Sequence, residues 1–132
     1  MTHKVLILFA HPALEKSRVH KQVVKGLETL EGVTFHDLYQ AYPNFEIDVN
    51  YEKQLLTQHD VIVFQHPLFW YSVPALIKEW IDLVLEHGWA YGHDGSQLRN
   101  KFWIHAITAG GGSEAYSKET FFRHTVREFL AP

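Results

Sequence analysis

The sequence predicts an α/β fold in which helices cover a parallel sheet. Two apolar runs rich in β-branched residues, KVLILFA (4–10) and DVIVFQ (60–65), have the composition of strands that are buried on both faces. KFWIHAIT (101–108) is a further strand. Helical segments separate these runs, and strands that alternate with helices form βαβ units with parallel pairing. A chain of 132 residues is long enough for a single core, so we expect one domain over residues 1–132.

The first helix is expected soon after the first strand. Ser17 is a favourable N-cap residue, and the helix is predicted to run to about Leu30. Its apolar side chains share one face, which consists of Val19, Val23, Val24 and Leu27. This spacing is typical of an amphipathic helix.

A second, strongly periodic helix is expected in the middle of the chain. Ser72 is predicted to cap it, Pro74 lies in its first turn, and it runs to about His87. The remaining elements are, in chain order, a strand over 32–39, a loop over 40–50, a short helix over 51–59, a glycine-punctuated loop over 87–100, and a helix that begins within 120–132 and stops at Pro132.

Composition and charge exclude several classes of protein. The net charge is −3 with acids and bases interspersed, so no basic stripe indicates a nucleic-acid partner. No apolar run has the roughly 18 residues that a membrane span needs, and the N-terminal apolar run ends at His-Pro rather than at a cleavage site. We therefore expect a cytoplasmic protein.

The chain contains no cysteine, which excludes disulfides, thiolate catalysis and cysteine metal sites. Any redox activity would therefore depend on a bound cofactor. None of the ten histidines forms an HExxH motif or a His-x-His pair, so no metal site is expected.

Three segments follow the carboxyl ends of predicted strands. They are the first loop HPALEKSRVH (11–20), the aromatic loop HPLFWYS (66–72) and the glycine loop TAGGGSEAY (108–116). In open parallel sheets, ligands bind in the crevice beyond the carboxyl ends of the strands. We therefore expect the three loops to lie together at one edge of the sheet.

The first two loops each have a ligand-binding and a structural interpretation. Ser17, Arg18 and the free N–H groups of the helix start could cradle a phosphate, or could form a simple N-cap beside a surface arginine. Phe69, Trp70 and Tyr71 could form a wall for a flat ring, with backbone N–H groups of residues 68–71 reaching its heteroatoms. They could equally be a core cluster or a dimer contact.

The glycine loop and a fourth segment are also open to two interpretations. Gly110, Gly111 and Gly112 either let the backbone approach a ligand closely or form a flexible turn. HGWAYGHDG (87–95) places Trp89, Tyr91 and His93 on a loop that could cover a ring, although Trp89 could simply anchor that loop on the core. The sequence has no GxGxxG motif after the first strand and no GxxxxGK[ST] motif, which disfavours Rossmann-type dinucleotide binding and a P-loop NTPase.

Together these motifs resemble the flavodoxin-like NAD(P)H:quinone oxidoreductases. The AHP of the first strand, Ser17, QHPLFWYSVPALIKEWIDLVL (65–85), HGWAYGHDG and TAGGGSEAY occur in the family's order over nearly the whole chain. The subgroup that the chain most resembles comprises the ancillary flavoprotein subunits of bacterial glutathione-gated potassium efflux systems. DLYQAYPNFEIDV (37–49) is also similar to that subgroup.

The resemblance implies a flavodoxin-like doubly wound sheet with strand order 2-1-3-4. Members of the subgroup continue with another helix, a fifth strand and a final helix. This chain stops at Pro132, so it resembles a truncated copy from which the fifth strand is missing.

The resemblance also implies bound FMN, in preference to FAD, with NAD(P)H as co-substrate. The implied flavin contacts are His11, Ser17, Arg18, Val19 and His20 at the phosphate and ribityl chain, Pro67, Leu68, Phe69, Trp70 and Tyr71 along the ring, and Thr108, Ala109, Gly110 and Gly111 at its other edge. The chain departs from the subgroup at two of these positions. The subgroup tends to have asparagine at the position of His20 and a second threonine at that of Ala109.

The implied activity is two-electron, ping-pong hydride transfer from NAD(P)H to a quinone, with Tyr91 hydrogen-bonded to a quinone oxygen. A homodimer is expected, and the protein could also regulate a potassium efflux system. The alternative is a non-catalytic flavin-fold subunit that docks on a membrane potassium/proton antiporter at the cytoplasmic face of the inner membrane. A one-electron carrier of the flavodoxin kind is disfavoured, because such carriers have strongly acidic surfaces and the net charge here is only −3.

Overall fold

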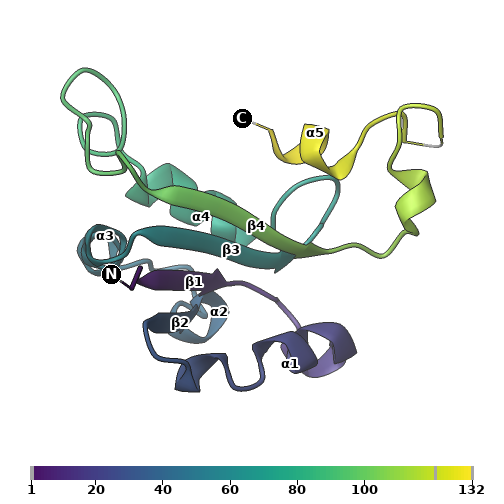
Figure 1. Cartoon of the computed structure of the whole chain (residues 1–132), viewed down its shortest axis with the longest axis horizontal. Helices are drawn as coiled ribbons and strands as arrows, with labels where there is room; N and C mark the ends of the chain where they lie inside the picture. The colour runs from purple at the N-terminus through teal and green to yellow at the C-terminus, as the bar shows by residue number, and fades with distance from the viewer. Residues whose placement is uncertain (1, 121, 132) are drawn as a thin grey trace.

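The computed structural model describes residues 2–120 and 122–131, which form a four-stranded parallel sheet with helices on its two faces (Figure 1). The strands lie in the order β2-β1-β3-β4, which confirms the predicted fold class and strand order. The strands are β1 (Val5–Phe9), β2 (Val33–Asp37), β3 (Val61–Pro67) and β4 (Phe102–Thr108). The helices are α1 (Arg18–Val24), α2 (Leu38–Ala41), α3 (Val49–Gln58), α4 (Ala75–Val84) and α5 (Val126–Leu130), and single 3-10 turns span Leu14–Lys16, Leu27–Thr29 and Ser113–Ala115.

The core lies on the face of the sheet that α2, α3 and α4 cover, behind the strands in Figure 1. Apolar side chains of β1 and β3 on this face, such as Leu8 and Phe64, pack against Leu76 and Trp80 of α4. The rings of Phe64 and Trp80 meet edge to face with centroids 5.4 Å apart. This half of the structure has the dense apolar packing that stabilises small α/β proteins.

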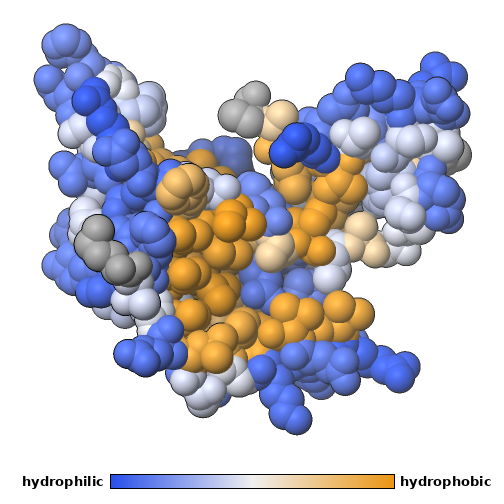
Figure 2. Space-filling view, viewed as in Figure 1, coloured by the Kyte–Doolittle hydropathy of each residue, from blue (hydrophilic) through white to orange (hydrophobic). Residues whose placement is uncertain are grey.

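The opposite face of the sheet is largely uncovered toward β4. We call this side the open sheet face. The register of the strands places on it Val5, Ile7, Val61, Val63, Phe102 and Ile104. The exposed fraction is 64% for Phe102 and 50% for Ile104. Figure 2 shows a continuous hydrophobic area on this side of the molecule.

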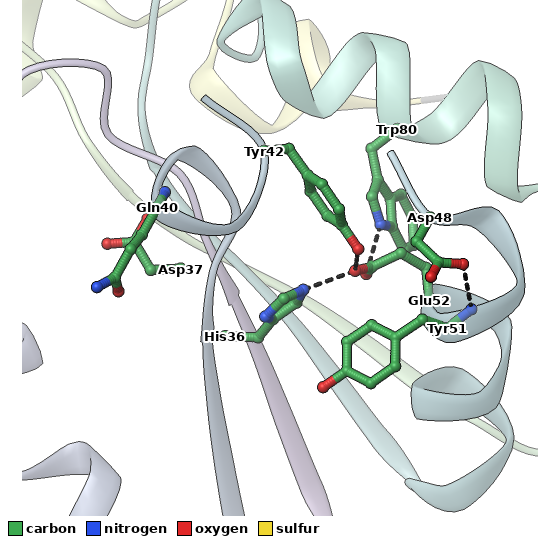
Figure 3. Close-up of polar contacts among 8 residues, drawn as sticks. All are labelled: His36, Asp37, Gln40, Tyr42, Asp48, Tyr51, Glu52 and Trp80. Carbon is green, nitrogen blue, oxygen red and sulfur yellow. Dashed lines mark hydrogen bonds and ion pairs between the residues drawn. The ribbon is translucent and has the colours of Figure 1, made fainter. Parts of the chain in front are cut away.

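One carboxylate, that of Glu52 on α3, is fully buried (Figure 3). The Tyr42 hydroxyl donates to its Oε1 at 2.6 Å, and His36 Nε2 lies 2.6 Å from the same oxygen. The indole N–H of Trp80 donates to Oε2 at 2.8 Å. Burial, and then the bond to Glu52, raises the pKa of Tyr42. These bonds join α3 to β2, to the end of α2 and to α4.

The first helix is shorter than predicted. Ser17 does cap it, because its Oγ accepts a hydrogen bond from the His20 amide at 3.2 Å. The helix ends at Val24 rather than near Leu30, since Gly26 adopts a left-handed φ of 83° and a separate 3-10 turn follows. The predicted apolar face was also wrong: Val19 and Val23 are exposed, and His20 is the buried residue of α1.

The start of α4 also differs from the prediction. Ser72 is not its N-cap, because its amide and carbonyl bond back to Phe69 in a tight turn. Pro74 occupies the N-cap position, and the helix ends at Val84 rather than His87. The predicted loop over 40–50 contains the end of α2 and the start of α3, whose first turn is capped by the Asp48 side chain.

The last predicted helix is present as α5, with a capping box between Thr125 and Glu128. Its predicted stop at Pro132 lies outside the described residues. No helix within residues 2–120 and 122–131 combines the length and the apolar character needed to cross a membrane.

Candidate functional site

The three strand-end loops lie together at the carboxyl edge of the sheet, as predicted. The Leu68 amide donates to the Thr108 carbonyl at 2.7 Å, which joins the aromatic loop to the glycine loop. His20 Nε2 lies 2.6 Å from Thr108 Oγ1, which joins the first loop to the glycine loop. The rings of His11 and Phe69 are 6.5 Å apart, so the first loop also meets the aromatic loop.

Within the first loop, the hydroxyl of Ser17 is used as a helix cap, while Arg18 and Val19 are exposed. His11 is half-buried, and its Nδ1 accepts a hydrogen bond from the Ala13 amide at 3.0 Å. Burial lowers the pKa of His11, and the nearby Glu15 opposes that shift. The predicted phosphate contacts are therefore close together, and Ser17 fulfils the structural interpretation.

His20 is the buried member of the first loop. Its ring packs against those of His11 and Phe9, with centroids 4.9 and 5.7 Å away. Burial, and then the nearby His11, lowers its pKa, so the neutral ring is favoured. Its Nδ1 is buried without a hydrogen-bond partner among the described residues, as is Nε2 of Gln65, which is in register with Phe9. Unsatisfied buried polar atoms are rare in folded proteins.

The aromatic loop forms a two-residue reverse turn with unusual residues at its centre. Phe69 and Ser72 exchange two backbone hydrogen bonds of 3.1 and 2.9 Å. Trp70 and Tyr71 between them have φ values of 47° and 64°. Positive φ at both central positions is the type I′ pattern, which normally selects asparagine and glycine. Two aromatic residues are thus held in a strained backbone, which is a recurrent property of ligand sites.

The three aromatic rings of this loop have different surroundings. Trp70 is 91% exposed, and Phe69 is half-exposed beside His11. The ring of Tyr71 packs on Phe122 and Phe129, with centroids 5.2 and 4.9 Å away. The structural interpretation therefore accounts for Tyr71, whereas Phe69 and Trp70 have surface that a ligand ring could cover.

The backbone donors of the aromatic loop are fewer than the sequence suggested. The amides of Leu68 and Phe69 bond to Thr108 and Ser72, so both are already used. Within residues 2–120 and 122–131, the amides of Trp70 and Tyr71 have no backbone acceptor. Only these two of the four predicted N–H groups are therefore available to a ligand.

The glycine loop is open at Gly110. A Cβ added at that position would meet no atom within 4 Å, whereas one at Gly111 would lie 3.3 Å from the Tyr116 ring. Ala109, Gly110 and Gly111 are all exposed. Gly110 is thus the point at which a ligand can approach the bare backbone of this loop.

Sequence reasoning assigned no role to His66, the first residue of the aromatic loop, or to His105 on β4. His66, fully buried on β3, has Nδ1 2.8 Å from the Pro67 carbonyl oxygen and Nε2 3.1 Å from His105 Nδ1 on β4. Burial lowers the pKa of His66 to about 4. The contact depends on the pairing of β3 with β4, and the linear sequence gives no signal for it beyond the alternation of both strands.

Tyr91 does not join the three loops. The segment 87–95 lies between α4 and β4 at the amino end of the sheet, opposite the loop that follows β4 (Figure 1). The ring of Tyr91 meets that of His87 at 5.3 Å, and Trp89 is partly buried against the core. Within one chain, the loop over 87–95 therefore lies away from the three loops that it was expected to cover, and Trp89 anchors it on the core.

Two cavities lie beside this edge, between β4, the glycine loop and α5. One, of about 590 Å³, is lined by Ala109 and Gly111 together with Tyr116 and Arg127. The other, of about 580 Å³, has His105 and Trp103 in its wall. Neither is lined by the first loop or the aromatic loop, and only the first of the two is bordered by the glycine loop.

Known proteins resemble the chain throughout its length. A family model described as the flavodoxin-like fold matches residues 3–132. The glutathione-regulated potassium-efflux system ancillary protein KefG of Enterobacter sp. (strain 638) is 47% identical over 131 residues, which cover 99% of this chain and 72% of that protein. Other KefG proteins are similar to the same degree.

Solved structures with this fold carry different functional names. General stress protein 14 of Treponema denticola in complex with FMN has a TM-score of 0.88 and 36% identity, covering 96% of this chain and 73% of that one. An NADPH-quinone reductase from P. pentosaceus has a TM-score of 0.85 and 32% identity, covering 96% and 71%. A protein described as a thermophilic tryptophan halogenase from Streptomycin violaceusniger has a TM-score of 0.90 and 44% identity, covering 94% and 72%. These proteins share one fold, but their names describe different reactions. The chain belongs to the flavodoxin-like fold family.

Proposed function

We propose that the chain is an FMN-dependent NAD(P)H:quinone oxidoreductase that transfers two electrons by a ping-pong mechanism. The observation that carries the proposal is the convergence of the first, aromatic and glycine loops at the carboxyl edge of the sheet. Similarity to an FMN complex and to an NADPH-quinone reductase supports the choice of cofactor and reaction.

The residues at this edge fit a flavin. Gly110 leaves open space beside the backbone, and His20 holds a buried nitrogen without a partner. Phe69 and Trp70 offer aromatic surface for a flat ring. The proposed FMN contacts are His11, Ser17, Arg18, Val19 and His20 for the phosphate and ribityl chain, and Pro67, Leu68, Phe69, Trp70, Tyr71, Thr108, Ala109, Gly110 and Gly111 for the ring.

The chain's own part in the reaction is to bind, orient and stabilise charge. FMN, when bound, would supply the two-electron chemistry between NAD(P)H and the quinone. The free amides of Trp70 and Tyr71 can stabilise negative charge at the ring, and fixed donors of this kind need no reorganisation during the reaction. The bond between His20 and Thr108 keeps two of the three loops at a fixed separation, which orients the cofactor.

A catalytic role for Tyr91 requires a second copy of the chain. Because Tyr91 lies at the other end of the sheet, it would have to reach the quinone from a partner subunit. We therefore propose a homodimer. Its assembly can be measured by analytical ultracentrifugation of the FMN-loaded protein, and a monomer that turns over at full rate would remove Tyr91 from the mechanism.

Flavin binding and turnover can be tested on the purified chain. FMN-loaded protein should absorb at about 450 nm and should reduce menadione with NADPH well above the rate of free FMN. Gly110→Val should weaken FMN binding without lowering the melting temperature, because the added side chain fills only the open space beside the loop. A colourless protein that does not take up FMN would contradict the proposal.

A second candidate function is supported by the similarity to KefG. The chain would then be a flavin-fold regulatory subunit, docked on a potassium efflux antiporter at the cytoplasmic face of the inner membrane, with catalysis incidental. FMN binding with menadione turnover near background would favour this role. Its direct test is potassium efflux from membrane vesicles that contain the antiporter, measured with and without the purified chain.

A further inference from the structure

The contact between His66 and His105 fixes the position of the hydrogen atoms on both rings. A carbonyl oxygen can only accept, so His66 Nδ1, 2.8 Å from the Pro67 oxygen, must carry a hydrogen. Burial keeps His66 neutral, so its Nε2 carries no hydrogen and can only accept a hydrogen bond. His105 Nδ1 lies 3.1 Å from that nitrogen and must donate to it. The result is a chain of two N–H donors that runs from β4 through β3 to Pro67.

This histidine chain ends at the base of the aromatic loop. Pro67 is the last residue of β3, and the next residue, Leu68, donates its amide to the Thr108 carbonyl. The Pro67 carbonyl is thus held by a side chain of β3, while the Leu68 amide is held by a carbonyl of β4. Both bonds precede the strained turn at Trp70 and Tyr71, whose free amides face no backbone acceptor in the described part of the chain.

We propose that His105 and His66 are positioning residues that hold the aromatic loop in its ligand-binding geometry through a hydrogen-bonded chain of two Nδ1–H tautomers. The effect on a ligand rests on the proposed function, in which this loop contacts FMN. The tautomers themselves are a property of the free protein and do not depend on any cofactor.

The opposite end of the sheet provides a matched control. His59 is also buried, with Nδ1 2.6 Å from the Leu55 carbonyl oxygen and Nε2 2.7 Å from Thr34 Oγ1. It makes the same number of hydrogen bonds as His66. Because it follows α3 and precedes β3, it lies at the amino end of the strands, away from the three loops.

The tautomers can be read by long-range proton–nitrogen NMR of the protein with nitrogen-15-labelled histidine at neutral pH. Free histidine side chains favour the Nε2–H tautomer. We expect His66 and His105 both to show Nδ1–H, with His66 bonded to its carbonyl acceptor. An Nε2–H tautomer at either position would overturn the proposal, whether or not the protein binds FMN.

The effect on the ligand can be measured by FMN titration and by the reduction potential of the bound flavin. His105→Phe removes the donor to His66 and should weaken FMN binding about tenfold, the effect of one lost hydrogen bond at a preorganised site. His105→Gln supplies an amide N–H and should restore most of that affinity. His59→Phe should lower the melting temperature while leaving FMN affinity and potential unchanged.

The possible failures can be told apart. If wild-type protein binds no FMN, the proposed function fails and the tautomer measurement alone decides on the histidine chain. If wild-type protein binds FMN and His105→Phe binds it with the same affinity and potential, the positioning role is excluded and the flavin assignment stands. Equal losses in His105→Phe and His59→Phe would assign both histidines to general stability, against the proposal.

Discussion

The surroundings of His66 oppose its protonation, and this makes the stability of the fold depend on pH. Its pKa is lowered from 6.5 to about 4 in the folded chain, chiefly by burial. Between pH 6.5 and pH 4, His66 binds a proton in the unfolded chain but not in the folded chain. Stability is therefore fully present above pH 6.5 and is lost as pH falls toward 4, by about 3 kcal/mol for this group.

Urea unfolding measured over this pH range would test the expectation. His66→Asn should unfold at lower urea overall, but its stability should change less with pH than that of the wild type. His93→Asn, at an exposed position, serves as the control and should leave the pH profile as it is. A wild-type profile that is flat between pH 6.5 and 4 would contradict the burial of a neutral His66.

Residue patterns alone could place the three loops but not the partners of individual side chains. Ser17 was found as a cap because the capping preference is local. His20, His66 and His105 meet partners 88, 1 and 39 positions away, and the two long-range contacts arise only when the strands pair. A linear sequence does not show which side chain a histidine will meet, which explains why the contact between the buried His66 and the exposed His105 was missed.

The turn of the aromatic loop stores backbone strain that a substitution can release. Trp70 has a φ of 47° and is 91% exposed, so its side chain forms little packing that could be lost. Asparagine tolerates the left-handed region better than tryptophan does. Trp70→Asn should therefore raise the free energy of unfolding by about 0.5–1 kcal/mol, measured by urea unfolding of the apoprotein.

The same substitution distinguishes the two roles of this loop. Trp70→Val is the matched comparison, because a β-branched side chain at positive φ should lower stability instead. If Trp70 covers a flavin, both variants should bind FMN more weakly in spite of their opposite stabilities. Unchanged FMN affinity in both would leave Trp70 without a part in the site.

The buried carboxylate of Glu52 is the main polar link of α3 to its neighbours. Glu52→Ala leaves Tyr42, His36 and the Trp80 indole without their acceptor and creates a cavity. We expect a loss of about 3–5 kcal/mol in the free energy of unfolding. Glu79→Ala, at an exposed position of α4, should change it by less than about 0.5 kcal/mol. Similar losses in the two variants would mean that the Glu52 network does not stabilise the fold.

At the scale of elements, the strands were predicted better than the ends of the helices. The apolar, β-branched composition of β1 and β3 leaves few alternatives, and both strands lie within the predicted runs or extend them by two residues. The end of α1 depends on Gly26 and the start of α4 on the turn between Phe69 and Ser72. Local propensity favours a longer helix in both cases, and tertiary context decides against it.

The whole molecule has one well-covered and one poorly covered face of the sheet. On the open sheet face, Phe102 and Ile104 expose apolar surface that a hydrophobic dye can bind. The double variant Phe102→Thr, Ile104→Thr should lower the fluorescence of bound anilinonaphthalene sulfonate several-fold, with little change in unfolding temperature, because threonine keeps a high strand propensity.

The control for this prediction is a pair of substitutions on the core face of β1 and β3. Leu6→Thr and Ile62→Thr should strongly destabilise the fold and increase dye binding, because both side chains are fully buried. Undiminished dye binding in the Phe102 and Ile104 variant would show that the dye binds elsewhere.

The α/β architecture could be predicted from the alternation of strands and helices. The unequal covering of the two faces of the sheet could not. A sequence shows which strand residues are apolar, but it does not show whether a helix covers them. Along this face of β4, Ala106 and Thr108 near the carboxyl edge are partly buried, while Phe102 and Ile104 remain exposed.

The edge position and the sequence of strand β4 affect how separate molecules of the protein associate. It lies at the edge of the sheet, and in the described part of the chain only β3 pairs with it. Its sequence FWIHAIT contains no proline and no carboxylate, lysine or arginine. Segments of this kind with an unpaired edge recruit the same segment from other molecules and stack into fibrils. We therefore expect concentrated protein to form ordered aggregates that begin at β4, grow from seeds and form faster once the first fibrils exist.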